Sequence, residues 1–204
     1  NNTVTLTATD AAGNTDNCTA TVTVNDNTAP NAVCQNVTLN LNASGTATLT
    51  TGQVNNGSSD NCSISSLTLS QVAFNCSDVG NNAVTLTATD PSGNTDNCSA
   101  TITVQDNIAP NAVCQNVTVQ LGAGGTATVT PGQINNGSTD NCSIASSSLN
   151  TTTFSCANQG ANNVTLTVTD PSGNSDNCTA TVTFQDNVDP TAVCQNVTVQ
   201  LNAS

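Results

Sequence analysis

The chain has 204 residues, with 13 acidic side chains, all aspartate, and no basic side chain, for a formal net charge of −13. Without Lys or Arg it has no group to displace counterions from phosphates, which excludes nucleic acid as a partner and disfavours an anionic membrane surface. No apolar run approaches the roughly 20 residues of a membrane-spanning helix, so we expect no membrane insertion.

Ten cysteines stand in a chain that has only three Phe and no Trp, Tyr or Met. Small domains that lack large apolar side chains bury too little surface to be stable alone, and disulfides compensate for this in oxidising compartments. We therefore expect an extracellular, cross-linked protein. The sequence begins and ends within a repeated pattern, so we expect a piece of a longer secreted chain.

The repeat has a period of 80 residues, because GNTDNC begins at Gly13 and at Gly93 and GNSDNC begins at Gly173. Each copy is preceded by a DN-x-x-P segment, whose proline restricts itself and the residue before it to extended geometry, as in a stiff linker. We predict the C-terminal part of one module in residues 1–26, complete modules in 27–106 and 107–186, and the N-terminal part of another in 187–204.

Alternation of apolar and polar residues predicts β-strands throughout each module. In chain order we expect strands at 37–41, 46–50, 64–69, 72–76, 84–89 and 98–104, with turns at 42–45 and 91–94. No stretch has a helical period. The sequence thus predicts an all-β fold of tandem, disulfide-stapled, immunoglobulin-like β-sandwich modules, in which the first and last strands run parallel.

Four cysteines in each module allow three connectivities. Cys34 opens the first strand and Cys98 the last, and the starts of two parallel strands can meet, whereas Cys62 and Cys76 bracket the middle hairpin. Cys34 is out of phase with the strand that follows it, which calls for a bulge or kink. We predict the pairs Cys34–Cys98, Cys62–Cys76, Cys114–Cys178 and Cys142–Cys156, with a Cys18–Cys34 type of bond across the linker as the alternative.

The combination of TDPSGNTDNC, ATITV, a DN-x-AP linker and AVCQNVTV resembles the hyalin-repeat module. This is an immunoglobulin-like extracellular repeat with the same Asp-x-x-Gly-Asn turn before its last strand. The sequence is also similar to tandem repeats of large surface proteins in Bacteroidetes-type bacteria. The resemblance implies an adhesive, spacer or fibre element.

Strand polarity gathers aspartates at one end of each module, because the incoming linker, the loop after the second strand and the loop before the last strand all lie there. Carboxylates that converge without a basic residue favour Ca²⁺, which takes six to eight oxygen ligands. We expect structural calcium sites at Asp26, Asp60, Asn61, Asp90, Asn94 and Asp96, and at Asp106, Asp140, Asn141, Asp170, Asn174 and Asp176. Asp10, Asp16 and Asp186 belong to incomplete sites of the same kind. The alternative is that these side chains only cap turns.

The function expected is a structural repeat region of an extracellular fibre or filament, in which calcium fixes the angle between modules. Its partners would be other copies of the module or chain, with glycans possible at Asn-x-Ser/Thr triplets such as Asn36-Val37-Thr38. The alternatives are the stalk of a cell-surface adhesin and a module that itself binds sugar or protein. We predict no catalytic residues and no enzyme activity, since His, Lys and Tyr are all missing.

Overall fold

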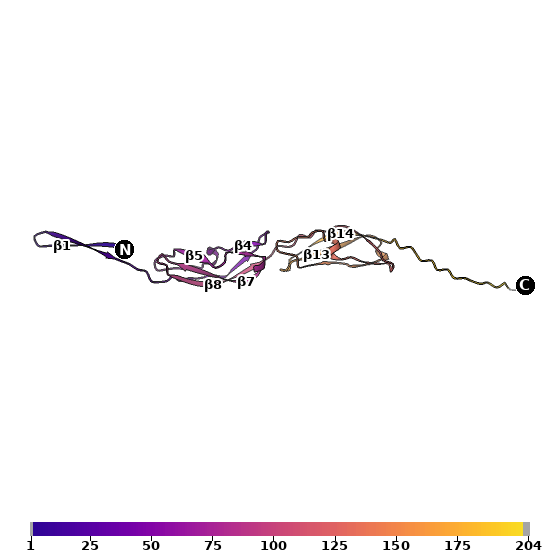
Figure 1. The fold of residues 1–204 in the computed structure, drawn as a ribbon, viewed down its shortest axis with the longest axis horizontal. Coiled ribbons are helices and arrows are strands. Elements are labelled where there is room, and N and C mark those ends of the chain that lie inside the picture. The colour runs from indigo at the N-terminus through magenta and orange to yellow at the C-terminus, as the bar shows by residue number, and fades with distance from the viewer. Residues whose placement is uncertain (1, 202–204) are drawn as a thin grey trace. The chain divides into compact units, whose positions relative to one another are not determined.

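The computed structural model describes residues 2–201 and divides the chain into two compact units (Figure 1). The first comprises the residues up to 41 together with 46–105, and the second comprises 42–45 together with the residues from 106 onward. At the start of the chain β1 (Asn2–Thr9) and β2 (Thr15–Val22) form an exposed antiparallel hairpin. Within residues 2–201 the helices are all too short to cross a membrane.

The first unit contains six further strands in two sheets. The strands are β3 (Val37–Asn40), β4 (Thr46–Thr48), β5 (Ser66–Leu69), β6 (Ala73–Asn75), β7 (Gly80–Thr89) and β8 (Thr95–Gln105). The larger sheet has the order β3-β8-β7-β5, and β4 pairs with β6 in the smaller one. The long strands β7 and β8 are visible along this unit in Figure 1.

The second unit repeats this arrangement. Its strands are β9 (Val117–Gln120), β10 (Thr126–Thr128), β11 (Ser146–Leu149), β12 (Thr153–Ser155), β13 (Gly160–Thr169) and β14 (Ser175–Gln185). The sheets have the orders β9-β14-β13-β11 and β10-β12. The all-β, immunoglobulin-like sandwich expected from the sequence is confirmed.

The first and last strands of each unit run parallel, as predicted. Val37 lies opposite Ile102 in the β3–β8 pair, and Val117 lies opposite Val182 in the β9–β14 pair. Two predicted disulfides close the same pairs: the Cα atoms are 5.8 Å apart in Cys34–Cys98 and in Cys114–Cys178.

The predicted phase conflict at Cys34 disappears because this residue precedes β3. Cys34 instead forms an isolated bridge with Asn55, and Cys114 does the same with Asn135. Residues 35 and 36 belong to no strand and separate the cysteine from β3, so no bulge within β3 is needed to bring the disulfide and the apolar face into register.

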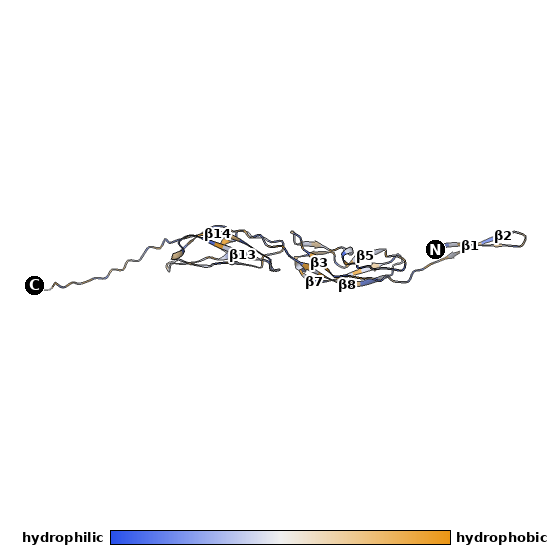
Figure 2. Ribbon diagram, turned by 180° about the vertical axis from the view of Figure 1, so that it is seen from behind, coloured by the Kyte–Doolittle hydropathy of each residue, from blue (hydrophilic) through white to orange (hydrophobic). Residues whose placement is uncertain are grey.

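The core of each unit lies between its two sheets and is built by alternation along the long strands, which carry both apolar and polar residues (Figure 2). Inward-facing residues of β13 and β14 are fully buried, whereas the threonines between them are partly exposed. Phe154 of the smaller sheet stacks on Phe184 of β14 with 4.3 Å between ring centroids. The other buried members of this core are Leu121, Val129, Ile134, Val164, Leu166, Val168, Ala180 and Val182.

Short helical turns correct the expectation that the modules contain only strands and loops. α1 (Thr51–Val54) and α2 (Pro131–Ile134) are single turns, and η1 (Cys76–Asp78) and η2 (Cys156–Asn158) are 3₁₀ turns. A single turn is too short to show a helical period. It is held by its cap, as where Gln53 accepts the backbone N–H of Thr50 at 2.9 Å.

The predicted pairs Cys62–Cys76 and Cys142–Cys156 are wrong. Cys62 and Cys156 are free thiols, while Cys76 and Cys142 are disulfide-bonded. We call the end of a module where β8 or β14 begins its proximal end, and the opposite end its distal end.

The reason for this correction is distance along the module. Cys76 lies just before the start of β7, at the distal end, whereas Ser65, three residues after Cys62, donates its backbone N–H to Thr89 at the end of β7. The ten residues of β7 span about 30 Å. A disulfide requires Cα atoms less than about 7 Å apart.

The Cys114–Cys178 bond closes a sequence separation of 64 residues. Replacing both cysteines with serine should lower the free energy of unfolding by about 4 kcal/mol, because the bond restricts the unfolded chain. Denaturant unfolding measures this loss. The control Cys156→Ser alters a free, exposed thiol and should change the free energy little. Equal effects of the two changes would contradict the assignment.

Candidate metal centre

Three aspartates from three separate segments meet at the proximal end of the second unit. Asp106 comes from the linker, Asp140 from the loop before β11 and Asp170 from the turn after β13. One carboxylate oxygen from each lies within 4.8 Å of the others, and Asp106 and Asp170 are buried. The strand polarity expected from the sequence thus brings these three predicted site residues together.

The turn between β13 and β14 owes its shape to Asp170. Its Oδ1 accepts the backbone N–H of Asn174 at 2.8 Å, and its Oδ2 accepts from Asn174 Nδ2 at 2.7 Å. Gly173 has φ 92°, a conformation that disfavours other residues. Asp90 and Asn94 form the same contacts in the first unit, at 2.7 Å each. Turn capping is therefore a real function of these aspartates.

The asparagine of this turn also holds the linker. Asn174 Nδ2 donates to the Asp106 carbonyl at 3.0 Å. In the first unit Asn94 Nδ2 donates to the carbonyls of Asp26 at 3.0 Å and Thr28 at 3.3 Å. Each linker is thereby fastened to the module that it leads into.

Asp106 and Asp140, the other two aspartates of the cluster, each have one carboxylate oxygen that accepts no hydrogen bond from a turn or loop. Asp140 Oδ2 accepts the backbone N–H groups of Cys142 at 2.9 Å and Ser143 at 3.0 Å, but its buried Oδ1 has no hydrogen-bond partner. Asp106 Oδ1 accepts from Ile108 N at 3.2 Å and Asn141 Nδ2 at 3.1 Å, whereas its buried Oδ2 has no partner.

The first unit repeats this pattern at the equivalent atoms. Asp26 Oδ2 and Asp60 Oδ1 are buried without a hydrogen-bond partner. Asp26 Oδ1 accepts from Thr28 N at 3.0 Å and from Asn61 Nδ2 at 3.4 Å. Buried oxygens of this kind carry a desolvation cost unless a donor or a cation compensates them.

The electrostatic consequence is repulsion. Two carboxylate charges no more than 4.8 Å apart repel by at least about 3 kcal/mol at an effective dielectric constant of about 20. The chain has no Lys, Arg or His to offset this. A hard divalent cation would offset it, and carboxylate, amide and backbone oxygens are the ligands that Ca²⁺ takes.

The corresponding cluster of the first unit contains a thiol. Asp26, Asp60 and Cys62 each place one ligand atom within 4.8 Å of the others. The Thr28 N–H and a hydrogen bond with Cys62 lower the pKa of Asp26. A hydrogen bond to Asp26 and the charges of Asp26, Asp60 and Asp90 raise the pKa of the Cys62 thiol. Sequence reasoning did not place Cys62 in this site, although its adjacency to Asp60 in NNGSSDNC was the available signal.

Asp96 and Asp176 are not brought into the clusters, contrary to expectation. Asp96 Oδ2 accepts the backbone N–H of Ala32 at 2.8 Å, and Asp176 Oδ2 accepts that of Ala112 at 2.9 Å. Both aspartates lie on the last strand of their modules, where the strand register turns their side chains toward the segment before the first strand. They fasten that segment to the sandwich.

The aspartates predicted to belong to incomplete sites form local contacts. Asp10 accepts from Asn14 Nδ2 at 2.8 Å and from two backbone N–H groups of its turn, and its pKa is lowered by these bonds. Asp16 accepts from Asn17 N at 2.9 Å, and Asp186 from Val188 N at 3.1 Å.

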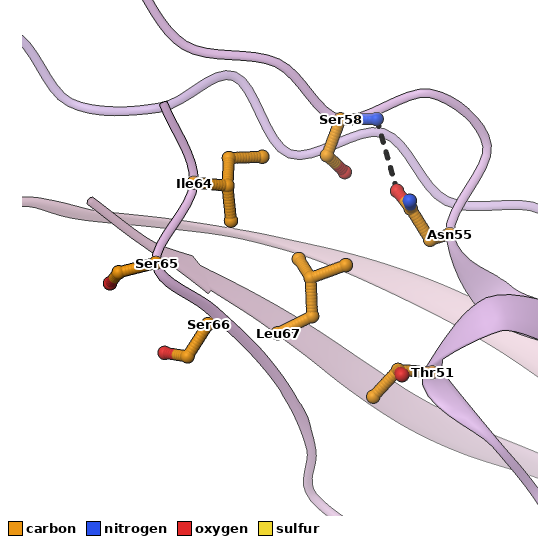
Figure 3. A pocket seen from close by; sticks show the side chains of 7 residues that line it. All are labelled: Thr51, Asn55, Ser58, Ile64, Ser65, Ser66 and Leu67. Carbon is orange, nitrogen blue, oxygen red and sulfur yellow. Dashed lines mark hydrogen bonds between the residues drawn. The ribbon is translucent and has the colours of Figure 1, made fainter. Parts of the chain in front are cut away.

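A hollow beside α1 lies near the proximal end of the first unit (Figure 3). Ile64 and Leu67 point into it, and Ser58 N donates to Asn55 Oδ1 at 3.0 Å at its rim. Its lining consists of Thr51, Asn55, Ser58, Ile64, Ser65, Ser66 and Leu67. These hydroxyl, amide and aliphatic groups include no acid, base or thiol, so the hollow does not provide the groups that acid–base catalysis needs.

Comparison with known proteins gives one informative similarity. No protein-family model matches the chain. The chain is similar to hyalin. It is 36% identical over 205 residues to "Hyalin" from Strongylocentrotus purpuratus, a match that covers 94% of this chain and 17% of hyalin. The chain thus spans about a sixth of that relative, and the identity supports a hyalin-repeat or immunoglobulin-like repeat.

Solved structures of other tandem-domain proteins are more distant. Mouse clustered PcdhgC3 EC1-3 is 14% identical, with a TM-score of 0.33 over 90% of this chain and 77% of the other. Titin domains I67-I69 are 11% identical, with a TM-score of 0.37 over 90% and 74%. At these TM-scores the similarity supports no further statement about the function of this chain. The disulfides belong to an oxidising, extracellular compartment, and the protein is extracellular.

The pKa of Asp176 predicts how its contribution depends on pH. The N–H groups of Ala112 and Asn177 hold this pKa below its ordinary value of 3.8. The stabilisation is complete above the ordinary pKa and is lost as the pH falls through the lower, folded-state pKa. The variant Asp176→Ala should therefore have a lower thermal midpoint than the wild type at pH 6, with a difference that shrinks below pH 3.8.

The control for this measurement is Asp189→Ala, which restores the residue found at the equivalent positions Ala29 and Ala109. Thermal melts at matched ionic strength from pH 2 to pH 7 supply the comparison. A difference between the wild type and Asp176→Ala that stays constant over this range would show that the carboxylate charge is irrelevant.

Proposed function

We propose that this chain is a structural repeat region of an extracellular fibre or filament, of the kind built by large bacterial surface proteins, and that each module is stabilised by calcium at its proximal end. The observation that supports the calcium most directly is the pair of buried, unpartnered carboxylate oxygens, which recurs at equivalent positions 80 residues apart. Extracellular repeats of this sort supply length, and their partners are other copies of the module or chain.

The ligands in the second unit would be the carboxylates of Asp106, Asp140 and Asp170, with the side chain of Asn141 beside them. In the first unit Asp26, Asp60 and Asp90 would provide the equivalent set. Backbone carbonyls and water would complete the six to eight oxygens that Ca²⁺ takes. Asn94 and Asn174 would hold the linker beside the site through their hydrogen bonds to the carbonyls of Asp26 and Asp106.

Calcium at this position would connect parts of the module that are distant in sequence. The linker contributes one ligand, the loop before β11 another and the turn after β13 a third. Binding would therefore limit the movement of the linker against the module it leads into. A fibre built from such modules would need calcium for stiffness as well as for stability.

The charge substitution Asp140→Asn tests the calcium site. It keeps one oxygen for the Cys142 and Ser143 N–H groups and removes the negative charge. In EGTA we expect the variant to have a higher thermal midpoint than the wild type, because repulsion is relieved. With Ca²⁺ the order should reverse, because for a Kd of about 10⁻⁴ M about 10 mM Ca²⁺ stabilises the wild-type site by about 2.7 kcal/mol.

The matched control is Asp78→Asn, which removes the same charge at the distal end of the first unit. Asp78 Oδ2 accepts the Asn75 N–H at 2.8 Å, and the equivalent residue Asn158 makes this contact naturally at 3.0 Å. The control should show no reversal. A wild-type midpoint that is the same in EGTA and in Ca²⁺ would leave these aspartates as turn residues alone.

Electron microscopy of the native material before and after EGTA treatment tests the fibre. Straight fibres of uniform width that soften or break up in EGTA are expected. Single flexible threads that end in a globular tip and do not respond to EGTA would instead identify the stalk of an adhesin, in which these modules project a binding domain.

A further inference from the structure

The free thiol Cys156 lies where the chain leaves the second unit. It begins η2, directly before β13, whose first residue Gly160 pairs with Phe184 near the end of β14. Asn162 Nδ2 donates to the Asn158 carbonyl at 2.6 Å and fixes this turn to the strand. The position of Cys156 is therefore set by the sheet.

The surroundings of Cys156 form a hollow at the distal end. The turn 122–125 closes one side and the outgoing segment, Asp186 and residues 188–191, the other. Cys156 Sγ lies 3.4 Å from the Gly125 carbonyl oxygen. A Cβ at Gly125 would lie only 2.6 Å from the sulfur, so glycine at this position keeps the thiol accessible. The segment that follows residue 191 therefore begins beside this thiol.

The equivalent cysteine of the first unit is already oxidised. Cys76 occupies the same place in η1 and is disulfide-bonded. Cys142, the proximal cysteine of the second unit, is also bonded, whereas its equivalent Cys62 is free. Both distal and proximal positions therefore support a disulfide in this fold, and neither can pair within its own module because of the length of β7 or β13.

A hydrogen bond made by another distal turn shows which segment such a turn can contact. Residues 42–45, which correspond to the turn 122–125 that lines the Cys156 hollow, belong to the second compact unit. There Asn141 Nδ2 lies 3.5 Å from the Asn42 carbonyl oxygen to which it donates. Asn141 directly precedes a proximal cysteine. The turn 42–45 thus contacts the residue that directly precedes a proximal cysteine.

We propose that Cys156 is the attachment point for a following copy of this module, and that it forms a disulfide with the proximal cysteine of that copy, the equivalent of Cys62 and Cys142. By the same rule Cys62 would accept the distal cysteine of a preceding copy. Each module in a long array would then carry one internal disulfide and one at each end. The covalent links would run end to end independently of the backbone.

Formation of the disulfide between Cys156 and the following copy requires an external disulfide as oxidant. Two thiols lose two protons and two electrons as the S–S bond forms, and a dithiol–disulfide oxidant of the secretory compartment takes up both and is reduced to its dithiol. In the laboratory oxidised glutathione serves as this acceptor and yields two molecules of reduced glutathione. Exchange proceeds through a mixed disulfide at one of the two cysteines.

Peptide mapping under non-reducing conditions tests the proposal. Free thiols of the denatured chain are first alkylated, and the chain is then cut at aspartate, since it has no Lys or Arg for trypsin. In the 204-residue chain we expect alkylation of Cys62 and Cys156, as of the other two free cysteines, Cys18 and Cys194. In a chain extended by one 80-residue repeat, oxidised with glutathione disulfide, Cys156 should be unlabelled and linked to the NNGS-x-DNC peptide of the added repeat.

The variant Cys156→Ser is the control in both chains. It should leave the thermal midpoint of the 204-residue chain unchanged, and in the extended chain it should leave the proximal cysteine of the added repeat open to alkylation. Alkylation of Cys156 in the extended chain would overturn the proposal, as would its recovery in a link between two separate chains. The inference rests on the proposed array, but the map needs neither calcium nor a fibre, so the two ideas fail separately.

Discussion

The parallel pairing of the first and last strands is the constraint on which the rest of each module depends. Because β3 lies beside β8, and β9 beside β14, the chain enters a module at the same end at which its last strand begins. The Cys34–Cys98 and Cys114–Cys178 bonds lock this arrangement. The linker, the loop before the third strand of the module and the final turn are thereby forced together, and all three carry aspartate.

The convergence of aspartates at one end of each module makes the absence of basic side chains important for its stability. A chain without a single basic side chain has no internal means of neutralising carboxylates that its own topology gathers. Part of the charge is absorbed by backbone N–H groups and by the asparagine of the final turn, as at Asp170. One oxygen of Asp106 and one of Asp140 are buried and accept no hydrogen bond. The calcium site is proposed because of these two oxygens, and not because of the number of aspartates.

The sequence predicted those features that depend on local pattern and on chain direction. Alternation located the long strands, and the parallel pair gave the two internal disulfides and the cluster of Asp106, Asp140 and Asp170. It misplaced Cys62 and Cys76, because cysteines that flank a hairpin in sequence lie about 30 Å apart when a long strand separates their ends. It also misassigned Asp96 and Asp176, since only the register shows that these side chains face Ala32 and Ala112. The thiol of Cys62 was missed as a neighbour of Asp26, although Cys62 follows the predicted site residue Asp60 by only two positions.

A structure determined from crystals or fibres grown in Ca²⁺ tests the proposed calcium sites most directly. We expect density at each proximal end, about 2.3–2.6 Å from carboxylate oxygens of Asp106, Asp140 and Asp170, and at the equivalent set around Asp26 and Asp60. Density at hydrogen-bonding distance only, as for water bound to Asp106 Oδ2 and Asp140 Oδ1, would contradict a calcium site and leave these residues as turn and loop caps.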